Sequence, residues 1–146
     1  MVGNILKKTF GLLMAGVILA GTVGMNTTVL ANNYTDTSFS FSMKNNMKYT
    51  GARTKTDTSK LYMKCNSVSV SNATYTAHAI GTNSTSDTGT DCSRGYTYNF
   101  GAGTAYYMTS WVKESGYKYA RIGASPNYSY SFTASGVWSP DNYNKY

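Results

Sequence analysis

The sequence has little charge, and acidic residues are the scarcer kind. Charged residues make up 13% of its 146 residues, with 6 Asp and Glu against 13 Lys and Arg. Soluble domains average about 25%. This shortage excludes a coiled coil and a charge-rich disordered chain, because both depend on dense charge. The length allows one domain.

Residues that carry enzyme chemistry are also scarce. His78 is the only His and Glu114 the only Glu, whereas most glycoside hydrolases use a pair of positioned carboxylates. The Gly-x-Ser-x-Gly pattern of a nucleophile elbow does not occur. Neither Cys has a His or another Cys at metal-ligand spacing. The sequence therefore predicts a protein that is not an enzyme and that has no cofactor or metal site.

Aliphatic residues are concentrated before residue 31. Lys7 and Lys8 precede an uncharged run of 16 residues, and Val29 and Ala31 occupy the −3 and −1 positions of a small-residue cleavage site. This is the layout of a secretory signal peptide, and the run is shorter than the ~20 residues that span a bilayer. We expect residues 1–31 to be removed and residues 32–146 to form a single secreted, extracellular domain. An uncleaved membrane anchor is the alternative.

The predicted mature chain must build its core from few aliphatic residues. Its net charge falls from +7 to +5, and its Leu, Ile and Val residues are Leu61, Val68, Val70, Ile80, Val112, Ile122 and Val137. All 14 Tyr remain. A buried aromatic side chain removes about 150–250 Å² from water. We therefore expect Tyr, Phe and Trp to supply much of the core and most tyrosines to be structural.

Alternation of apolar and polar residues with a period of two is typical of strands. It occurs over residues 38–43, 60–65, 74–79 and 128–135. Residues 96–100, 106–113 and 117–123 also have strand composition, and residues 114–116 would join the last two as a hairpin. The sequence predicts an all-β fold, a small antiparallel β-sandwich or barrel of six to eight short strands.

Cys65 and Cys92 both lie in the part of the chain that is predicted to be exported. Cysteines of exported proteins commonly pair, so we predict a disulfide between them. It would close a loop of about 28 residues and contribute roughly 3.6 kcal/mol. Two free thiols and an intermolecular bridge are the alternatives.

Six basic residues lie between residues 44 and 64, where Asp57 alone opposes them: Lys44, Lys48, Arg53, Lys55, Lys60 and Lys64. This cluster favours contact with an anionic cell-wall polymer or a membrane surface. Protection of strand edges from aggregation explains it equally well. The sequence indicates neither nucleic acid nor a small-molecule substrate as a partner.

The two tryptophans occupy different sequence surroundings. Trp138 lies beside the Ser139–Pro140 turn and is the better surface candidate of the two, able to stack on a sugar ring, although a core position that closes one end of the domain is favoured. Trp111 lies within a predicted strand, which favours a core position.

The C-terminal part of the chain resembles a known group of proteins. Residues 117–123 read YKYARIG, residues 128–134 read YSYSFTA, and residues 135–141 read SGVWSPD, a Gly-x-Trp-x-x-Asp-like ending. This is similar to small exported β-rich proteins of Gram-positive bacteria, a family of unknown function. A fainter likeness is to the lactococcin 972-type bacteriocins, which are generally shorter and richer in His. Neither resemblance implies catalytic residues.

These features predict a secreted, non-catalytic extracellular or cell-surface protein with a binding or interaction role. A secreted bacteriocin-like antibacterial or membrane-active protein is the alternative, and a small hydrolase ranks third.

Overall fold

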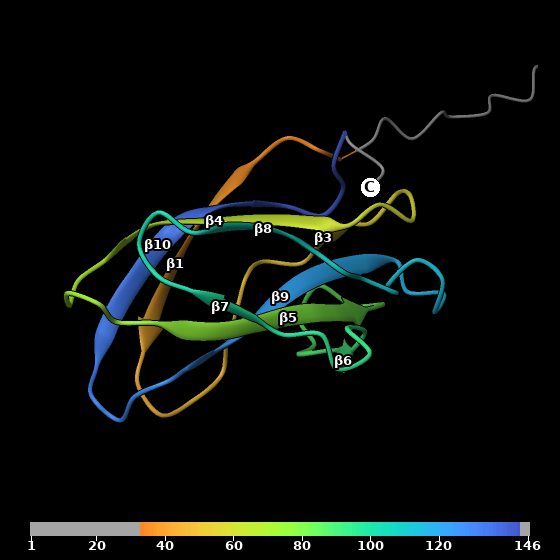
Figure 1. Ribbon diagram of the computed structural model, residues 1–146. Helices are drawn as coiled ribbons and strands as arrows, with labels where there is room; N and C mark the ends of the chain where they lie inside the picture. The colour runs from red at the N-terminus through yellow and green to blue at the C-terminus, as the bar shows by residue number, and fades with distance from the viewer. Residues whose placement is uncertain (1–32, 144–146) are drawn as a thin grey trace, which may run out of the picture.

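The computed structural model describes residues 33–143, which form ten strands and no helix (Figure 1). The strands are β1 (Thr37–Met43), β2 (Lys48–Tyr49), β3 (Arg53–Thr54), β4 (Leu61–Val68), β5 (Tyr75–Thr82), β6 (Thr90–Asp91), β7 (Tyr98–Phe100), β8 (Ala105–Met108), β9 (Tyr119–Pro126) and β10 (Phe132–Ser139). The predicted signal peptide lies outside the described residues. Over residues 33–143 there is no helix long and apolar enough to cross a membrane.

The strands form two antiparallel sheets in two layers (Figure 1). The first sheet has the order β1-β10-β4-β8. In the second, β9 pairs with β5, β2 and β3 pair with β9, and β6 and β7 pair with β5. The predicted all-β antiparallel fold is confirmed. The structure has ten strands where six to eight are predicted, because β2, β3 and β6 have two residues each and are too short to show alternation.

Alternation along the longer strands places one face against the other sheet. In β1, Phe39, Phe41 and Met43 are buried, while Ser40 and Ser42 are exposed. The same pattern in β4 and β10 lines the inner face of the first sheet with buried side chains. The period-two pattern of the sequence therefore corresponds to inward and outward faces.

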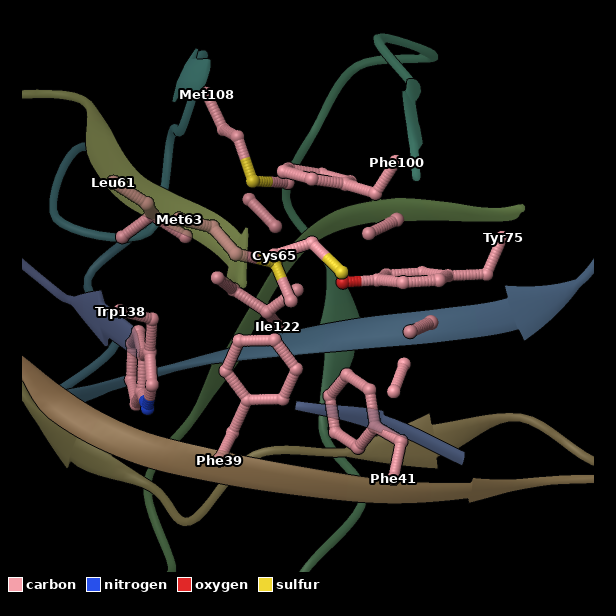
Figure 2. Close-up of a cluster of buried hydrophobic side chains, with 14 of the residues drawn as sticks. Phe39, Phe41, Leu61, Met63, Cys65, Tyr75, Phe100, Met108, Ile122 and Trp138 are labelled. Atoms are coloured by element: carbon pink, nitrogen blue, oxygen red, sulfur yellow. The ribbon is translucent and has the colours of Figure 1, made fainter. Parts of the chain in front are cut away.

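The apolar core lies between the two sheets, and Figure 2 shows its centre. Phe41 of β1 meets Tyr75 of β5 edge-on, with ring centroids 6.1 Å apart. Tyr75 stacks on Phe100 at 5.4 Å. Around these rings pack Leu61 and Met63 of β4 and Ile122 of β9, all fully buried. These contacts join β1 and β4 of the first sheet to β5, β7 and β9 of the second.

Tyrosine contributes less to this core than the composition predicts. Among the described residues Tyr75 is the one buried tyrosine, and seven are exposed: Tyr34, Tyr96, Tyr106, Tyr107, Tyr128, Tyr130 and Tyr143. Their places are taken by Phe and Trp138, by the small residues of β5 and β9, and by Met43, Met63 and Met108. Met is unbranched and flexible, so it fills irregular gaps.

A sheet-to-sheet crossing replaces the predicted hairpin at residues 114–116. β8 pairs with β4 in the first sheet, whereas β9 pairs with β5 in the second. The connecting turn has backbone hydrogen bonds from Ser115 to Trp111 (2.9 Å) and from Tyr117 to Val112 (3.1 Å). Val112 is fully buried, and this burial holds the crossing against the core.

Gly136 allows β10 and β4 to approach each other closely. The register between these strands shifts at Ser135/Gly136. A Cβ atom at position 136 would lie 1.9 Å from the carbonyl oxygen of Lys64, far inside van der Waals contact. The irregularity in the sheet therefore requires glycine here.

The predicted disulfide between Cys65 and Cys92 is wrong, because both residues are free thiols. Cys65 lies on β4 of the first sheet, and its sulfur lies beside the Tyr75 hydroxyl (Figure 2). Cys92 follows β6 and packs against Gly81 of the second sheet. Burial raises the pKa of both thiols. Export and cysteine count indicate that two cysteines can pair, but they carry no information about which strands hold them.

Candidate functional site

The six basic residues of the predicted anionic-surface contact do not form one face. Lys44 and Lys64 are exposed, Lys48, Arg53 and Lys60 are half-buried, and Lys55 is buried. Lys48 and Arg53 belong to β2 and β3 of the second sheet and Lys64 to β4 of the first. The others lie in connecting segments, Lys44 after β1 and Lys55 and Lys60 between β3 and β4. Lys55 has no surface available for a ligand.

Lys55 instead forms a buried ion pair with Asp141, 86 residues along the chain. Nζ of Lys55 lies 2.7 Å from Oδ1 of Asp141, and both side chains have no exposed area. Nζ also donates to the carbonyl oxygen of Ser59 at 2.5 Å. The pair joins the segment after β3 to the segment after β10.

A shell of donors surrounds the Asp141 carboxylate. The backbone N–H and the hydroxyl of Thr56 both donate to Oδ2, and so does the backbone N–H of Asn33 at 3.1 Å. Asp57 lies on the other side of the ammonium, with its Oδ1 3.6 Å from Nζ. We call these residues the buried ionic cluster: Asn33, Lys55, Thr56, Asp57, Ser59 and Asp141.

The Asp141 carboxylate is held in its charged form. Burial alone would raise its pKa, but hydrogen bonds from Lys55 and Thr56 and the charge of Lys55 outweigh that effect and lower the pKa. A buried charge is tolerated only when such partners replace water. No sequence pattern indicates this cluster, because Lys55 and Asp141 are 86 positions apart and each lies in an ordinary polar segment.

The candidate role of Trp138 as a surface aromatic is wrong, and the residue occupies the core position that the sequence favours. It is 1% exposed and belongs to the core cluster. The Arg53 guanidinium lies 5.5 Å from its ring centroid and donates to its carbonyl oxygen at 3.2 Å. Trp138 is an inward residue of β10, so strand alternation decides its position and the neighbouring turn does not.

The other tryptophan, Trp111, forms a surface group with Arg94 and Tyr96. The Arg94 guanidinium lies 4.4 Å from the Trp111 ring centroid. The Tyr96 ring stacks beside the same indole, with centroids 6.2 Å apart and planes inclined by 20°. Tyr96 is 55% exposed and Trp111 is half-buried. We call these three residues the aromatic–arginine cluster.

A tight turn presents this cluster. Arg94 and Gly95 both have positive φ, at 52° and 83°, and the Tyr96 N–H donates to the Ser93 carbonyl at 3.1 Å. Two positive φ values in succession define a type I′ turn. Such a φ is uncommon for any residue other than glycine and costs on the order of 1–2 kcal/mol.

The base of the turn is fixed by a carboxylate and by a backbone contact. Oδ1 of Asp91 accepts from the backbone N–H and the hydroxyl of Ser93, at 2.7 and 2.6 Å. Partial desolvation alone would raise the pKa of Asp91, but these hydrogen bonds lower it, with a smaller contribution from the neighbouring His78. The backbone N–H of Trp111 donates to the backbone carbonyl of Cys92 at 2.9 Å. These contacts hold Trp111 beside the turn.

Two other surface features are simpler. Tyr128 and Tyr130 stack at 5.0 Å in the loop between β9 and β10, with no cation on either ring among the described contacts. An open hollow of about 360 Å³ is lined by Gly81, Thr82, Asn83, Asp87, Gly89, Thr90 and Tyr117. Asp87 is the charged residue of that lining, so the hollow offers few groups that would orient a ligand.

Within residues 33–143, no group of three or more His, Cys, Asp or Glu residues could hold a metal ion. Comparison with known proteins gives one match. Residues 27–142 match the family described as "Protein of unknown function (DUF2712)". No curated protein and no solved structure matches the chain.

Proposed function

The chain belongs to the DUF2712 family, and we propose that it is a secreted, non-catalytic protein that binds an anionic polymer of the bacterial cell surface through the aromatic–arginine cluster. Export is supported by the basic residues Lys7 and Lys8, the uncharged run that follows and the small-residue site ending at Ala31.

The observation that carries the proposal is the strained conformation of Arg94. A side chain held at φ 52° gains nothing for the fold that glycine would not give more cheaply. What the conformation does achieve is to place a guanidinium 4.4 Å from an accessible indole. Residues kept in unfavourable backbone regions are concentrated at functional sites.

The chemistry of the cluster indicates the class of ligand. Two nearly parallel rings offer flat apolar surfaces on which sugar rings can stack, and the guanidinium offers paired N–H donors to phosphate or carboxylate. The net charge of +5 that remains after the predicted cleavage, which removes Lys7 and Lys8, adds long-range attraction to a polyanion. A polymer with alternating sugar and anionic groups matches both parts of the cluster.

The test is co-sedimentation of the purified protein with insoluble cell-wall polymer. Arg94→Gly is the sharpest variant, because glycine accepts the positive φ and the turn survives without the charge. We expect the association constant for the polymer at low salt to fall at least about tenfold (a change of ~1.4 kcal/mol), while the thermal stability stays equal or rises slightly.

Tyr128→Ala is the matched control, because it removes one ring of an exposed stacked pair that lacks a cation. It should bind as the parent protein does. Trp111→Ala should lose binding as Arg94→Gly does, and high salt should weaken the parent. Equal binding by the parent protein and Arg94→Gly would contradict the proposal.

A further inference from the structure

The buried ionic cluster places a lysine nitrogen against a carboxyl group under conditions that favour more than an ion pair. Lys and Asp are almost never fully buried, yet both Lys55 and Asp141 have no exposed area. Removing two charges from water is costly, and their attraction repays this cost only with excellent geometry. An amide would hold the same two side chains together without any charge.

The distance between the two groups is suitable for a reaction. Nζ of Lys55 is 2.7 Å from Oδ1 of Asp141. With a C–O bond of about 1.2 Å, this puts the nitrogen on the order of 3.5 Å from the carboxyl carbon Cγ. That is close to the separation of reacting atoms in a near-attack geometry, where fixed groups gain large effective concentrations. Both partners are held by the fold, Nζ by Ser59 and the carboxylate by Thr56 and Asn33.

Acyl transfer also needs donors that stabilise negative charge on the carboxyl oxygen and a group that carries protons, and the surrounding residues supply both. Oδ2 of Asp141 accepts from the Thr56 N–H, the Thr56 hydroxyl and the Asn33 N–H, an arrangement that would stabilise negative charge on that oxygen in a tetrahedral intermediate. Oδ1 of Asp57 lies 3.6 Å from Nζ and accepts hydrogen bonds from Ser59, while Oδ2 of Asp57 is buried without a hydrogen-bond partner. The Asp57 carboxylate is therefore the group beside the ammonium that can accept a proton and deliver it again.

We propose that Lys55 and Asp141 condense spontaneously into an intramolecular amide bond. A proton first passes from Nζ to Oδ1 along their existing hydrogen bond. The nitrogen then attacks Cγ, the Nζ–Cγ bond forms, and the Cγ–Oδ1 bond breaks. Of the three ammonium protons, one remains on the amide nitrogen and two leave with Oδ1 as water, one of them carried by Asp57. No oxidant, reductant or co-reactant is consumed.

The product fits the contacts that already surround the pair. Oδ2 becomes the amide carbonyl oxygen and keeps its donors from Thr56 and Asn33. The remaining N–H keeps the Ser59 carbonyl as its acceptor. The bond would connect the segment after β3 to the segment after β10 and so close a covalent loop around most of the domain.

The experiment is an intact-mass measurement of the folded full chain, denatured just before analysis. We expect a mass lower than that of the sequence by one water. Peptide mapping should then yield one branched peptide that contains both Lys55 and Asp141. Lys60→Arg, at a neighbouring half-buried lysine, is the control and should also be lighter by one water.

Lys55→Arg removes the nucleophile but keeps the charge, and it should have the full sequence mass. Asp57→Asn should leave the chain unreacted or slow the loss of water at least tenfold. Full sequence mass in the folded parent protein would overturn the proposal. Loss of water that persists in Lys55→Arg would also overturn it, because cyclisation of an Asp side chain onto the backbone would then explain the mass. The parent protein's branched peptide decides the question even if the variants fail to fold.

Discussion

The interior of the molecule contains two regions built on opposite principles. Between the sheets, Phe39, Phe41 and Met63 belong to one core of buried, largely apolar side chains. The Arg53 guanidinium lies against Trp138 of that core and donates a hydrogen bond to Asn33 of the buried ionic cluster. In that cluster the charges of Lys55 and Asp141 are as inaccessible to water as the apolar side chains. One region is stabilised by apolar surface removed from water, and the other by the hydrogen bonds and the charge pairing around Lys55 and Asp141.

This difference determines how each region responds to change. Apolar packing is a sum over many contacts, so a substitution removes one part of it and the neighbours relax. The buried ionic cluster depends on each member, because removal of one partner leaves another charge buried without compensation. We therefore expect its substitutions to have larger effects than those in the core, although it contains fewer residues.

The largest effect is expected from Lys55→Met, compared with Lys55→Arg so that neither variant can form the amide. Met leaves the Asp141 carboxylate buried without a cation, and the free energy of unfolding at pH 7 should be lower than in Lys55→Arg by about 3–5 kcal/mol. Urea unfolding followed by circular dichroism measures it.

The same pair of variants has a defined pH dependence. The pKa of Asp141 is lowered in the folded protein, so its contribution is complete above the unfolded value of about 3.9 and is lost as the pH falls through the lower folded value. In Lys55→Met the cation is missing and the pKa of Asp141 should rise. The difference in the free energy of unfolding between the two variants should therefore become smaller in acid. A difference that stays constant from pH 7 to pH 3 would show that the pairing of Asp141 is not its source.

A smaller effect is expected in the apolar core from Met63→Ala. Met63 is fully buried, and removal of such a side chain typically costs about 2–5 kcal/mol through lost transfer energy and the cavity left behind. Lys64→Ala, at the next position of β4 but exposed, should change stability by less than about 0.5 kcal/mol. Similar losses at both positions would contradict the assigned faces of β4.

The smallest effect is expected from Tyr75→Phe, which sharpens the comparison because Tyr75 is a polar group inside the apolar region. Its hydroxyl is buried, forms no hydrogen bond of normal geometry and points at the Cys65 sulfur (Figure 2). Deletion of a buried group without a partner costs little, so stability should stay within about 1 kcal/mol of the parent or rise. A loss above about 2 kcal/mol in urea unfolding would mean that the hydroxyl is strongly bonded.

The sequence predicts the fold better than the site. Alternation identifies β1, β4 and β5 because each has one face against the other sheet, and the expected turn at Ser139–Pro140 agrees with the end of β10 at Ser139. It placed the start of β10 too early, because Tyr128 and Tyr130 have strand composition but lie in an exposed loop.

The interior polar contacts were beyond any local signal. The sequence groups Lys55 with five neighbouring basic residues as a surface charge, because its partner Asp141 lies 86 positions further along the chain. The core position expected for Trp111 is also wrong, because β8 ends at Met108 and the chain then leaves the sheet, so that Trp111 is half-buried outside a strand. Which residues meet across the sandwich depends on topology, and period-two alternation carries no information about topology.

The strand order of the first sheet has a consequence for folding. β10, the last strand along the chain, lies between β1 and β4 and pairs with both. A ribosome or translocation channel that delivers the chain from its N-terminus therefore releases β1 and β4 long before the strand that joins them. Until residue 139 emerges, β1 exposes an unpaired edge, and its partner must be found across about 100 residues of chain at a substantial loop-closure cost. We expect the first sheet to assemble only after the chain is complete, so folding should be post-translational and dominated by long-range contacts.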